Sequence, residues 1–196
     1  FCLSSIEFQL YTVYSKGISN FMQEYRTNRK RIAINDFSFD AARFCDEWVL
    51  LCAGDFSKQH YNAMTISWGS YGQVWKMMFF QVFVRPTRYT YEFMERYNSF
   101  TLSLFDKTYH DALALLGTRS GRDCNKIQEA GLTPEPSLEV PAPGFKEASL
   151  IIECKKIYFQ DIDSMHFLEP SIETHYPHHD YHRMYFGSVV AVSSIN

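Results

Sequence analysis

Hydrophobic and polar positions alternate between Asn62 and Gly69 in a way that is typical of a β-strand. Met64, Ile66 and Trp68 are large and apolar, whereas the positions between them are small or carry hydroxyl groups. A period of two places successive side chains on opposite faces of a sheet. The pattern therefore predicts a strand with one buried face and one face that presents hydroxyls.

A second strand and a helix are predicted downstream. Gly69 and Gly72 indicate a turn. The run Phe79–Val84 is short, apolar and rich in aromatic and β-branched residues, as expected of a buried strand. It ends at the sequence Arg85-Pro86-Thr87-Arg88-Tyr89-Thr90, after which residues 91–97 read as a helix. Two arginines and two threonines thus stand between a buried strand and a helix start.

This corner, residues 85–90, has two interpretations. Helix N-termini offer free N–H groups and the positive end of a dipole, so the arginines and threonines predict an anion site. Alternatively, Thr87 or Thr90 caps the helix while Arg85 and Arg88 are only solvated. Because capping is the commoner use of Thr at this position, the corner taken alone favours the second interpretation.

A second cluster, Gly117–Asp123, packs two glycines, two hydroxyls and two arginines into seven residues. Turns of this composition make concavities of N–H groups that hold phosphate. The segment also lies between two predicted helices, so it could equally combine a C-cap with an N-cap. It is neither a Walker loop nor a Gly-x-Gly-x-x-Gly fingerprint, so a nucleotide-like ligand would bind through a different architecture.

Short strands dominate the rest of the chain, which predicts a mainly β fold, a barrel with peripheral helices. A proline-containing loop is expected at residues 132–144. Further strands are predicted at residues 48–52, 100–104, 150–160 and 184–192, and helices at 40–45, at 109–116 after an Asp106 cap, and between an Asp123 cap and Gly131.

Composition limits the function classes. The net charge of −3 and pI of about 6.2 give no case for nucleic-acid binding by bulk charge. No apolar run reaches membrane-spanning length, so no membrane association is expected. The five cysteines are widely spaced and odd in number, which favours reduced thiols and a cytoplasmic location. Most of the aromatic residues, 17% of the chain, are expected in the core.

Four histidines near the C-terminus suggest an alternative function, metal binding. His175, His178, His179 and His182 fall within eight residues, close to carboxylates. Imidazoles at this density can bind zinc, nickel or iron. However, Pro177 prevents a regular helix through the cluster, and ligands must converge in space. We therefore assign no metal, and keep a metal-binding barrel as the weakest alternative.

Taken together, these motifs resemble the flavin reductase-like, FMN-binding split-barrel family, in particular its flavoredoxin-like branch. Four segments in the same order carry the resemblance, which extends over residues 36–192: residues 62–105, 117–134, 150–163 and 180–187. It implies a six-stranded split β-barrel with helices outside, usually a homodimer, with FMN near the subunit interface. One departure is Met77-Met78 after Trp75-Lys76, where relatives often carry proline.

The resemblance also implies roles for individual residues. His182, in the sequence His182-x-x-x-x-Gly187-x-Val189, would lie on the nicotinamide side of the flavin, although a histidine without a role is the alternative. The cofactor-binding residues implied along the flavin ring are Asn62, Met64, Thr65, Ile66 and Ser67. Those implied at the phosphate and ribityl chain are Arg85, Thr87, Arg88 and Thr90. Those completing the pocket or meeting the nicotinamide nucleotide are Ser120, Gly121 and Arg122.

The function implied is NAD(P)H-dependent flavin reduction, a hydride transfer between nicotinamide and flavin. An FMN-bearing electron carrier, reduced by a protein partner, is the main alternative. Residues 36–196 are expected to form one FMN-binding domain. Residues 1–35 are expected to be an N-terminal extension of lower order. Residues 1–21 within it are expected to be either specific to this branch or upstream of a natural start at Met22.

Overall fold

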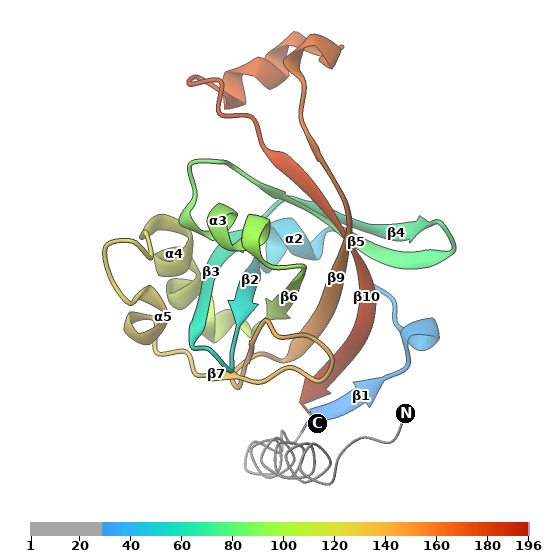
Figure 1. Cartoon of the computed structure of the whole chain (residues 1–196), viewed down its shortest axis with the longest axis vertical. Coiled ribbons are helices and arrows are strands. Elements are labelled where there is room, and N and C mark those ends of the chain that lie inside the picture. Colours follow the sequence, from blue (N-terminus) through green and yellow to red (C-terminus); the bar gives the residue numbers. More distant parts are fainter. Residues whose placement is uncertain (1–28, 196) are drawn as a thin grey trace, which may run out of the picture.

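The computed structural model describes residues 29–195, and a large antiparallel sheet dominates them (Figure 1). Its strands run in the order β3-β2-β6-β9-β10-β5-β4, with β1 added alongside β10. The strands are β1 (Arg29–Ile32), β2 (Val49–Asp55), β3 (His60–Ile66), β4 (Gly69–Val74), β5 (Met77–Val84), β6 (Ser99–Leu104), β9 (Leu150–Asp161) and β10 (Arg183–Ile195).

Helices lie around this sheet, and a second, two-stranded sheet closes a proline-containing loop. The two short strands are β7 (Pro134–Glu135) and β8 (Gly144–Phe145). The helices are η1 (Ile34–Asp36), α2 (Arg43–Asp46), α3 (Tyr89–Arg96), η2 (Lys107–Tyr109), α4 (His110–Thr118), α5 (Lys126–Glu129), η3 (Ser164–His166) and η4 (Pro170–His175). The predicted mainly β fold with peripheral helices is confirmed.

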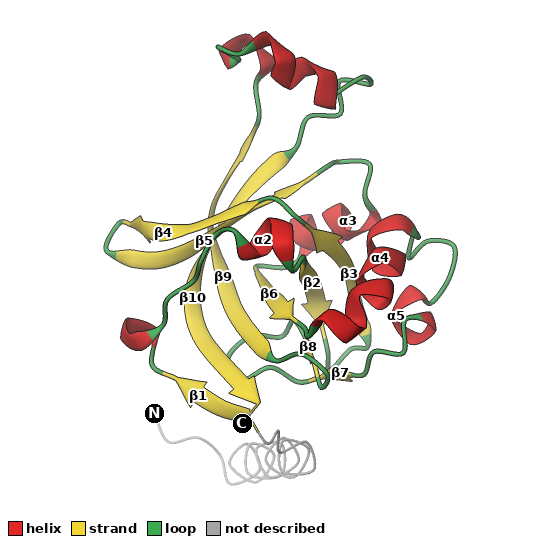
Figure 2. Ribbon diagram, turned by 180° about the vertical axis from the view of Figure 1, so that it is seen from behind, coloured by secondary structure: helices red, strands yellow, loops and turns green. Residues whose placement is uncertain are grey.

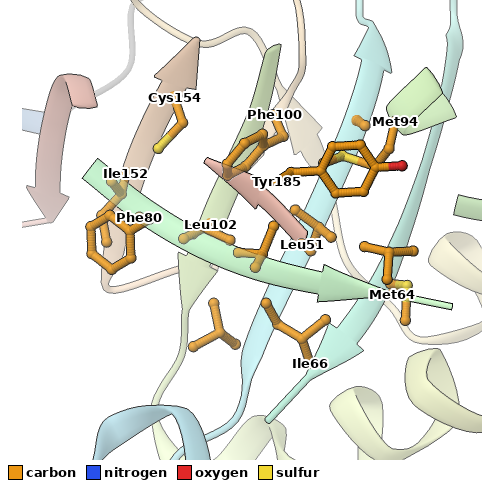
Figure 3. Packing of buried hydrophobic residues seen from close by; sticks show 14 of the residues in the cluster. Leu51, Met64, Ile66, Phe80, Met94, Phe100, Leu102, Ile152, Cys154 and Tyr185 are labelled. Atoms are coloured by element: carbon orange, nitrogen blue, oxygen red, sulfur yellow. The ribbon is translucent and has the colours of Figure 1, made fainter. Parts of the chain in front are cut away.

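The core explains why the β2 sequence is apolar without alternation. Leu51 points into the main cluster inside the sheet, together with Phe80, Phe100 and Tyr185 (Figure 3). Leu50, on the opposite face, joins a second cluster beneath α4 and α5. Because both faces of β2 are covered, every residue of this strand is buried.

Helices α3, α4 and α5 gather on the side of the sheet where β3 is the outermost strand (Figures 1 and 2). Thr65 on β3 donates its hydroxyl proton to the carbonyl of Leu113 on α4, at 2.6 Å. Asn62, on the same strand, donates its side-chain amide to the Thr90 hydroxyl on α3, at 2.7 Å. These two bonds fix the start of α3 and the middle of α4 relative to β3.

The connection between β9 and β10 forms an arm that projects from the sheet and carries η3 and η4 at its tip (Figures 1 and 2). Arg183 at its base pairs with Asp161 at 2.7 Å and with Glu95 of α3 at 2.8 Å. Glu95 also accepts the hydroxyl proton of Tyr185 at 2.6 Å. The base of the arm is therefore tied directly to α3.

Some local predictions are wrong. The turn expected at Gly69 and Gly72 is instead strand β4, and the chain reverses at Trp75 and Lys76, which adopt φ values of 50° and 60°. Trp68 lies beyond β3 with 43% of its surface exposed, because the alternation stops when the strand ends.

Two predicted helix caps also differ from the structure. Asn125, not Asp123, caps α5 by accepting the N–H of Gln128 at 3.3 Å. Asp106 precedes η2 but makes no side-chain capping bond there. Asn, Asp and Ser are similar in capping preference, so a sequence with several candidates does not decide which residue is the cap.

The expectations for residues 1–28 lie outside the described residues. Just after them, Arg29 on β1 pairs with Glu135 and donates to the carbonyls of Phe145 and Ala148. Residues 29–32 thus add a strand to β10. Within residues 29–195, no helix combines the length and apolar character needed to cross a bilayer.

Candidate functional site

Two neighbouring cavities lie beside β3 and share Met64 and Arg88 in their walls. The β3 cavity, about 210 Å³, is lined by Met64, Thr65, Ile66, Ser67, Trp68, Phe83, Arg85, Arg88 and His182. The α3 cavity, about 70 Å³, is lined by Met64, Thr87, Arg88, Tyr89, Thr90, Leu116, Gly117, Thr118, Arg119, Ser120 and Lys126. Residues from the corner, the Gly117–Asp123 loop and the C-terminal motif thus meet along one strand.

The wall of the β3 cavity comes from the end of an edge strand. Among the strands of residues 29–195, β3 pairs only with β2, so its other edge carries backbone groups that none of these strands satisfies. Met64 and Ile66 are buried and give an apolar surface, while Ser67 is exposed. The Thr65 hydroxyl already donates to Leu113, so it can only accept from a ligand. The cavity therefore combines an apolar face with a polar strand edge.

The N-terminus of α3 opens toward the second cavity without a side-chain cap. Arg88 occupies the N-cap position and makes no capping bond. Thr90 is buried, and its hydroxyl accepts from Asn62 rather than closing the helix end. The interpretation that a threonine merely caps this helix is therefore wrong. The first N–H groups of α3 are left to face an acceptor from outside the helix.

The positive charge around the α3 cavity is incompletely balanced. Within residues 29–195, no carboxylate pairs with Arg88, whose guanidinium only approaches the Gly117 carbonyl at 3.4 Å. Lys126 is 4% exposed and donates to the carbonyls of Leu116 and Arg119 at 2.9 and 3.1 Å. Burial and the nearby Arg88 charge lower the pKa of Lys126 to about 8. A dianion would relieve this repulsion.

Arg85 has a different environment from Arg88. Its guanidinium pairs with Asp180 at 2.9 Å, donates to the His175 carbonyl at 2.7 Å and lies over the Tyr176 ring. Arg85 therefore joins the end of β5 to the arm while lining the β3 cavity. Arg85 and Arg88, which look equivalent in the sequence, thus have different partners in the structure.

The Gly117–Asp123 segment comprises the last two residues of α4 and the loop after it, and it lies against β3 and α3. A Cβ on Gly121 would lie 2.3 Å from Oδ1 of Asn62 and 3.1 Å from the Tyr89 ring, so only glycine allows this approach. The Ser120 hydroxyl accepts the N–H of Arg122 at 3.2 Å, which leaves its own proton for a ligand. Ser120 lines the α3 cavity, whereas Asn62, Gly121 and Arg122 face a third cavity beside it.

Residues 41–196 match the protein family described as the flavin reductase like domain. This chain belongs to that family. A similar solved structure, the FMN-binding domain of a flavin reductases-like enzyme from Shewanella baltica OS155, has a TM-score of 0.61 and 18% identity, over 86% of this chain and 78% of that one. The flavoredoxin of Desulfovibrio vulgaris (Miyazaki F) has a TM-score of 0.58 and 23% identity, over 75% and 68%.

Two curated relatives match over shorter stretches. An uncharacterized protein of Aquifex aeolicus (strain VF5) is 30% identical over 69 residues, 35% of this chain and 35% of that protein. One from Pyrococcus abyssi (strain GE5 / Orsay) is 32% identical over 74 residues, 38% of this chain and 42% of that protein. The chain thus spans less than half of either curated relative. The predicted split-barrel fold is confirmed as that of the flavin reductase-like family.

In this flavin reductase-like chain, the wall of the β3 cavity contains one titratable group with a strongly shifted pKa, His182. It is 9% exposed, its Nδ1 lies 2.9 Å from the Tyr176 hydroxyl, and its ring lies 5.1 Å from that of Trp68. Burial, followed by the Arg85 charge, lowers the pKa of His182 to about 4. The imidazole is therefore neutral at pH 7 and serves as a hydrogen-bonding group rather than a cation.

We expect His182 to make the protein less stable in mild acid. The pKa of His182 is about 4 in the folded state, whereas the ordinary value of 6.5 applies in the unfolded chain, so the unfolded chain binds the proton more tightly. Stability from this group is complete above pH 6.5 and falls between pH 6.5 and 4, by up to about 3 kcal/mol. Urea unfolding across this range should show a flatter profile for His182→Gln. An unchanged profile, matching that of the exposed-site control His178→Gln, would contradict the assignment.

The other histidines of the cluster do not converge. His175 meets the edge of Trp68, and His179 lies 3.2 Å from Glu173. In the part of the chain that the structure describes, no group of three or more His, Cys, Asp or Glu side chains could hold a metal. The chain spacing that suggested a metal site therefore does not correspond to a cluster in space.

Several cavity residues escaped the sequence analysis. Lys126 lies in a short amphipathic helix where a lysine is ordinarily solvated, and nothing in its spacing signals burial. Trp68 was assigned to the core, although the end of the strand at Ile66 places it at the cavity. Phe83 alternates with buried residues on β5, so its partial exposure was a detectable signal. At the α3 cavity, Leu116 was also missed, whereas Tyr89, Gly117, Thr118 and Arg119 lie in the two predicted anion-binding segments but were given no individual role.

Proposed function

We propose that this protein binds FMN and acts as an NAD(P)H-dependent flavin reductase, with hydride transfer between nicotinamide and flavin. One observation carries the proposal: a cavity with an apolar face, on an edge strand, adjoins an uncapped helix N-terminus where Lys126 is buried and Arg88 has no carboxylate partner among the described residues. A flat ring bearing a phosphorylated chain matches both halves. Membership in the flavin reductase like domain family supports the same choice.

The donor set at the two cavities fits FMN in charge and chemistry. Arg88, the α3 N–H groups and Ser120 would hold the phosphate, because all can donate to its oxygens. Thr87 would join them by turning its hydroxyl proton from Asp180, to which it donates at 3.5 Å, toward the phosphate. Met64 and Ile66 would pack on the ring, with Ser67 and the β3 edge at its polar rim. Lys126 would add charge behind the phosphate, and Thr90, held by Asn62, would shape the pocket floor. When bound, FMN supplies the hydride acceptor.

The protein's part in this reaction is orientation and electrostatics, so we nominate no acid–base pair. We assign Nδ1 of His182 as the acceptor of the Tyr176 hydroxyl proton, which leaves Nε2–H for a ligand in the β3 cavity. A neutral donor there would help position the nicotinamide or stabilise negative charge on the reduced flavin. Arg85, fixed by Asp180, would add positive potential at the same wall.

We expect His182→Ala to retain FMN but to slow its reduction by NAD(P)H by about tenfold, the value of one lost hydrogen bond. Anaerobic stopped-flow absorbance would measure the rate, and equilibrium titration would measure FMN affinity. Tyr176→Phe is the companion variant, because it removes only the hydroxyl that orients the imidazole. Reduction at the unaltered rate in His182→Ala would show that this histidine is structural.

Lys126 predicts a pH dependence for FMN binding. Its pKa is about 8 without ligand, and a nearby phosphate would raise it. Affinity should therefore change by no more than about twofold between pH 7 and 8, then fall above pH 8 by at most tenfold per pH unit, until the pKa of the bound state is passed. Fluorescence titrations should show this fall in the unsubstituted protein and in the exposed-site control Lys107→Met, but not in Lys126→Met. A fall that persists in Lys126→Met would exclude Lys126 as its source.

An FMN-bearing electron carrier reduced by a protein partner is the second candidate. The similarity to the flavoredoxin of D. vulgaris favours keeping it. Both candidates need the same FMN site, so only kinetics separate them. FMN-loaded protein that bleaches within seconds on mixing with NADH or NADPH would support the reductase. Persistence of the oxidised band, with normal FMN affinity, would favour the carrier.

We also propose that two copies associate and that the protein works in a reducing, cytoplasmic compartment. An aromatic patch supports association: Trp75 and Tyr158 are 60% and 40% exposed and adjoin the stacked rings of Phe79 and Phe186. The proposal of a reducing compartment is supported by the free thiols of Cys45, Cys52, Cys124 and Cys154. Light scattering should give the mass of a dimer, and Trp75→Ser should shift it toward the monomer; monomeric unsubstituted protein would refute the dimer.

A further inference from the structure

An ion pair between two exposed side chains lies next to the proposed phosphate site. Arg122 comes from the Gly117–Asp123 segment, and Glu92 comes from the first turn of α3. Nη2 of Arg122 donates to Oε1 of Glu92, and among residues 29–195 this is the carboxylate that pairs with Arg122. The resemblance implied a place for Arg122 in the cofactor pocket, whereas in the structure its guanidinium is held by Glu92.

The guanidinium of Arg122 lies at the edge of the α3 cavity. It covers the Tyr89 ring at 4.9 Å and donates to the Thr87 carbonyl at 3.3 Å, and both of these residues line that cavity. Arg122 does not line the α3 cavity itself but borders the neighbouring third cavity, which measures about 540 Å³. The charged end of Arg122 is thus held beside the α3 cavity rather than in it.

Arg88 and Arg122 therefore differ in their availability to a ligand. Arg88 has no carboxylate partner among the described residues, whereas Arg122 is occupied by Glu92. The Arg122 and Glu92 side chains are 44% and 57% exposed, and exposed pairs of this kind contribute little to stability. A charge-assisted bond to a phosphate is stronger. A phosphate dianion at the N-terminus of α3 would therefore draw Arg122 away from Glu92.

We propose that Glu92 is a positioning residue that competes with the flavin phosphate for Arg122. It thereby sets how readily FMN is released and how strongly FMN is preferred over riboflavin. The inference rests on the proposed function. Glu92 lines none of the three cavities, so it acts through Arg122 rather than by touching the flavin. Arg122 turns to the phosphate when FMN binds and returns to Glu92 when FMN leaves.

The competition has a consequence for the two candidate functions. Ready release of FMN suits a reductase that exchanges its flavin, whereas firm retention suits an electron carrier. Glu92 favours release, because it lowers the affinity for a ligand that needs Arg122. Riboflavin has the same ring without the phosphate, so its affinity is independent of the pair.

Glu92→Gln is the variant that breaks the pair. Glutamine matches glutamate in size and in helix propensity, so α3 is retained. Glu47→Gln is the matched control, because Glu47 also pairs with an arginine, Arg43 at 2.8 Å, and lines none of the three cavities. Arg122→Gln, alone and combined with Glu92→Gln, completes a double-mutant cycle.

The experiment is a fluorescence titration of flavin-free, full-length protein with FMN and with riboflavin, together with the rate of FMN release after rapid dilution of FMN-loaded protein. We expect Glu92→Gln to bind FMN about threefold more tightly and to release it about threefold more slowly. Riboflavin affinity should stay within about 1.5-fold, and Glu47→Gln should match the unsubstituted protein. In the Arg122→Gln background, Glu92→Gln should change FMN affinity by less than about 1.5-fold.

Three results would overturn the inference and leave the proposed function intact. The first is unchanged FMN affinity in Glu92→Gln, and the second is an equal gain for FMN and riboflavin. The third is a gain for FMN that persists in the Arg122→Gln background, because the Glu92 charge would then act on the phosphate directly. Failure of the unsubstituted protein to bind either flavin would refute the proposed function itself, and this inference with it.

Discussion

Arg88→Ala is expected to weaken FMN binding about 10- to 100-fold. Arg88 stands at the uncapped N-terminus of α3 and has no carboxylate partner among the described residues. A charge-assisted bond to phosphate is worth about 1.5–3 kcal/mol, which corresponds to this loss. The measurement is a fluorescence titration of flavin-free protein with FMN and, in parallel, with riboflavin. Riboflavin affinity should hardly change, because riboflavin lacks the phosphate.

Arg85→Ala is the matched control for this prediction. Arg85 is held by Asp180 and the His175 carbonyl, so its loss should loosen the arm and lower FMN affinity by less than the Arg88 change does. Arg88→Lys retains the charge and should restore part of the affinity. Equal losses of FMN and riboflavin in Arg88→Ala, or no loss of either, would contradict the assignment of Arg88 to the phosphate.

Gly187→Ala is expected to destabilise the protein, by on the order of 5 °C in Tm. A Cβ at this position would lie 2.5 Å from Cζ of Phe100 and 2.7 Å from Cβ of Cys154, both fully buried. Overfilling such a core costs about 1–3 kcal/mol, and each kcal/mol lowers Tm by about 2–4 °C at this chain length. Thermal unfolding followed by circular dichroism would measure the shift.

Gly72→Ala is the control for this effect. The nearest atom to its added Cβ is Cε1 of the half-buried Phe79, at 3.3 Å, which can move aside. Its Tm should change by no more than about 2 °C. A Tm for Gly187→Ala equal to that of Gly72→Ala would show that β10 does not pack as tightly on β6 and β9 as the structure requires.

The sequence predicted the strands other than β1, β4 and the two short strands β7 and β8, because these strands have a clear local periodicity or a continuous apolar run. The apolar run before Arg85 and the helix after it are observed as β5 and α3, each of which begins two residues earlier than predicted. The turn near Gly72 was wrong because glycine there serves β4, while the reversal uses two non-glycine residues in the left-handed region, Trp75 and Lys76. Such conformations are decided by the sheet as a whole rather than by local preference.

The sequence predicted which segments line the two cavities, but not the different contacts that individual residues within those segments make. Arg85 and Arg88 look equivalent in sequence, and only the return of the arm past β5 gives one of them a carboxylate partner. Lys126 becomes part of the site because α5 folds back beneath the end of α4. These contacts join residues from different elements, and no pattern within one element encodes them.

The most direct test of the account is the visible absorption spectrum of protein that has been incubated with FMN and desalted, recorded anaerobically before and after addition of NADH or NADPH. The account predicts a retained flavin band that is much weaker in Arg88→Ala and that bleaches quickly with one of the two nucleotides. No retained band in the unsubstituted protein would contradict the central claim that the β3 and α3 cavities together form a flavin site.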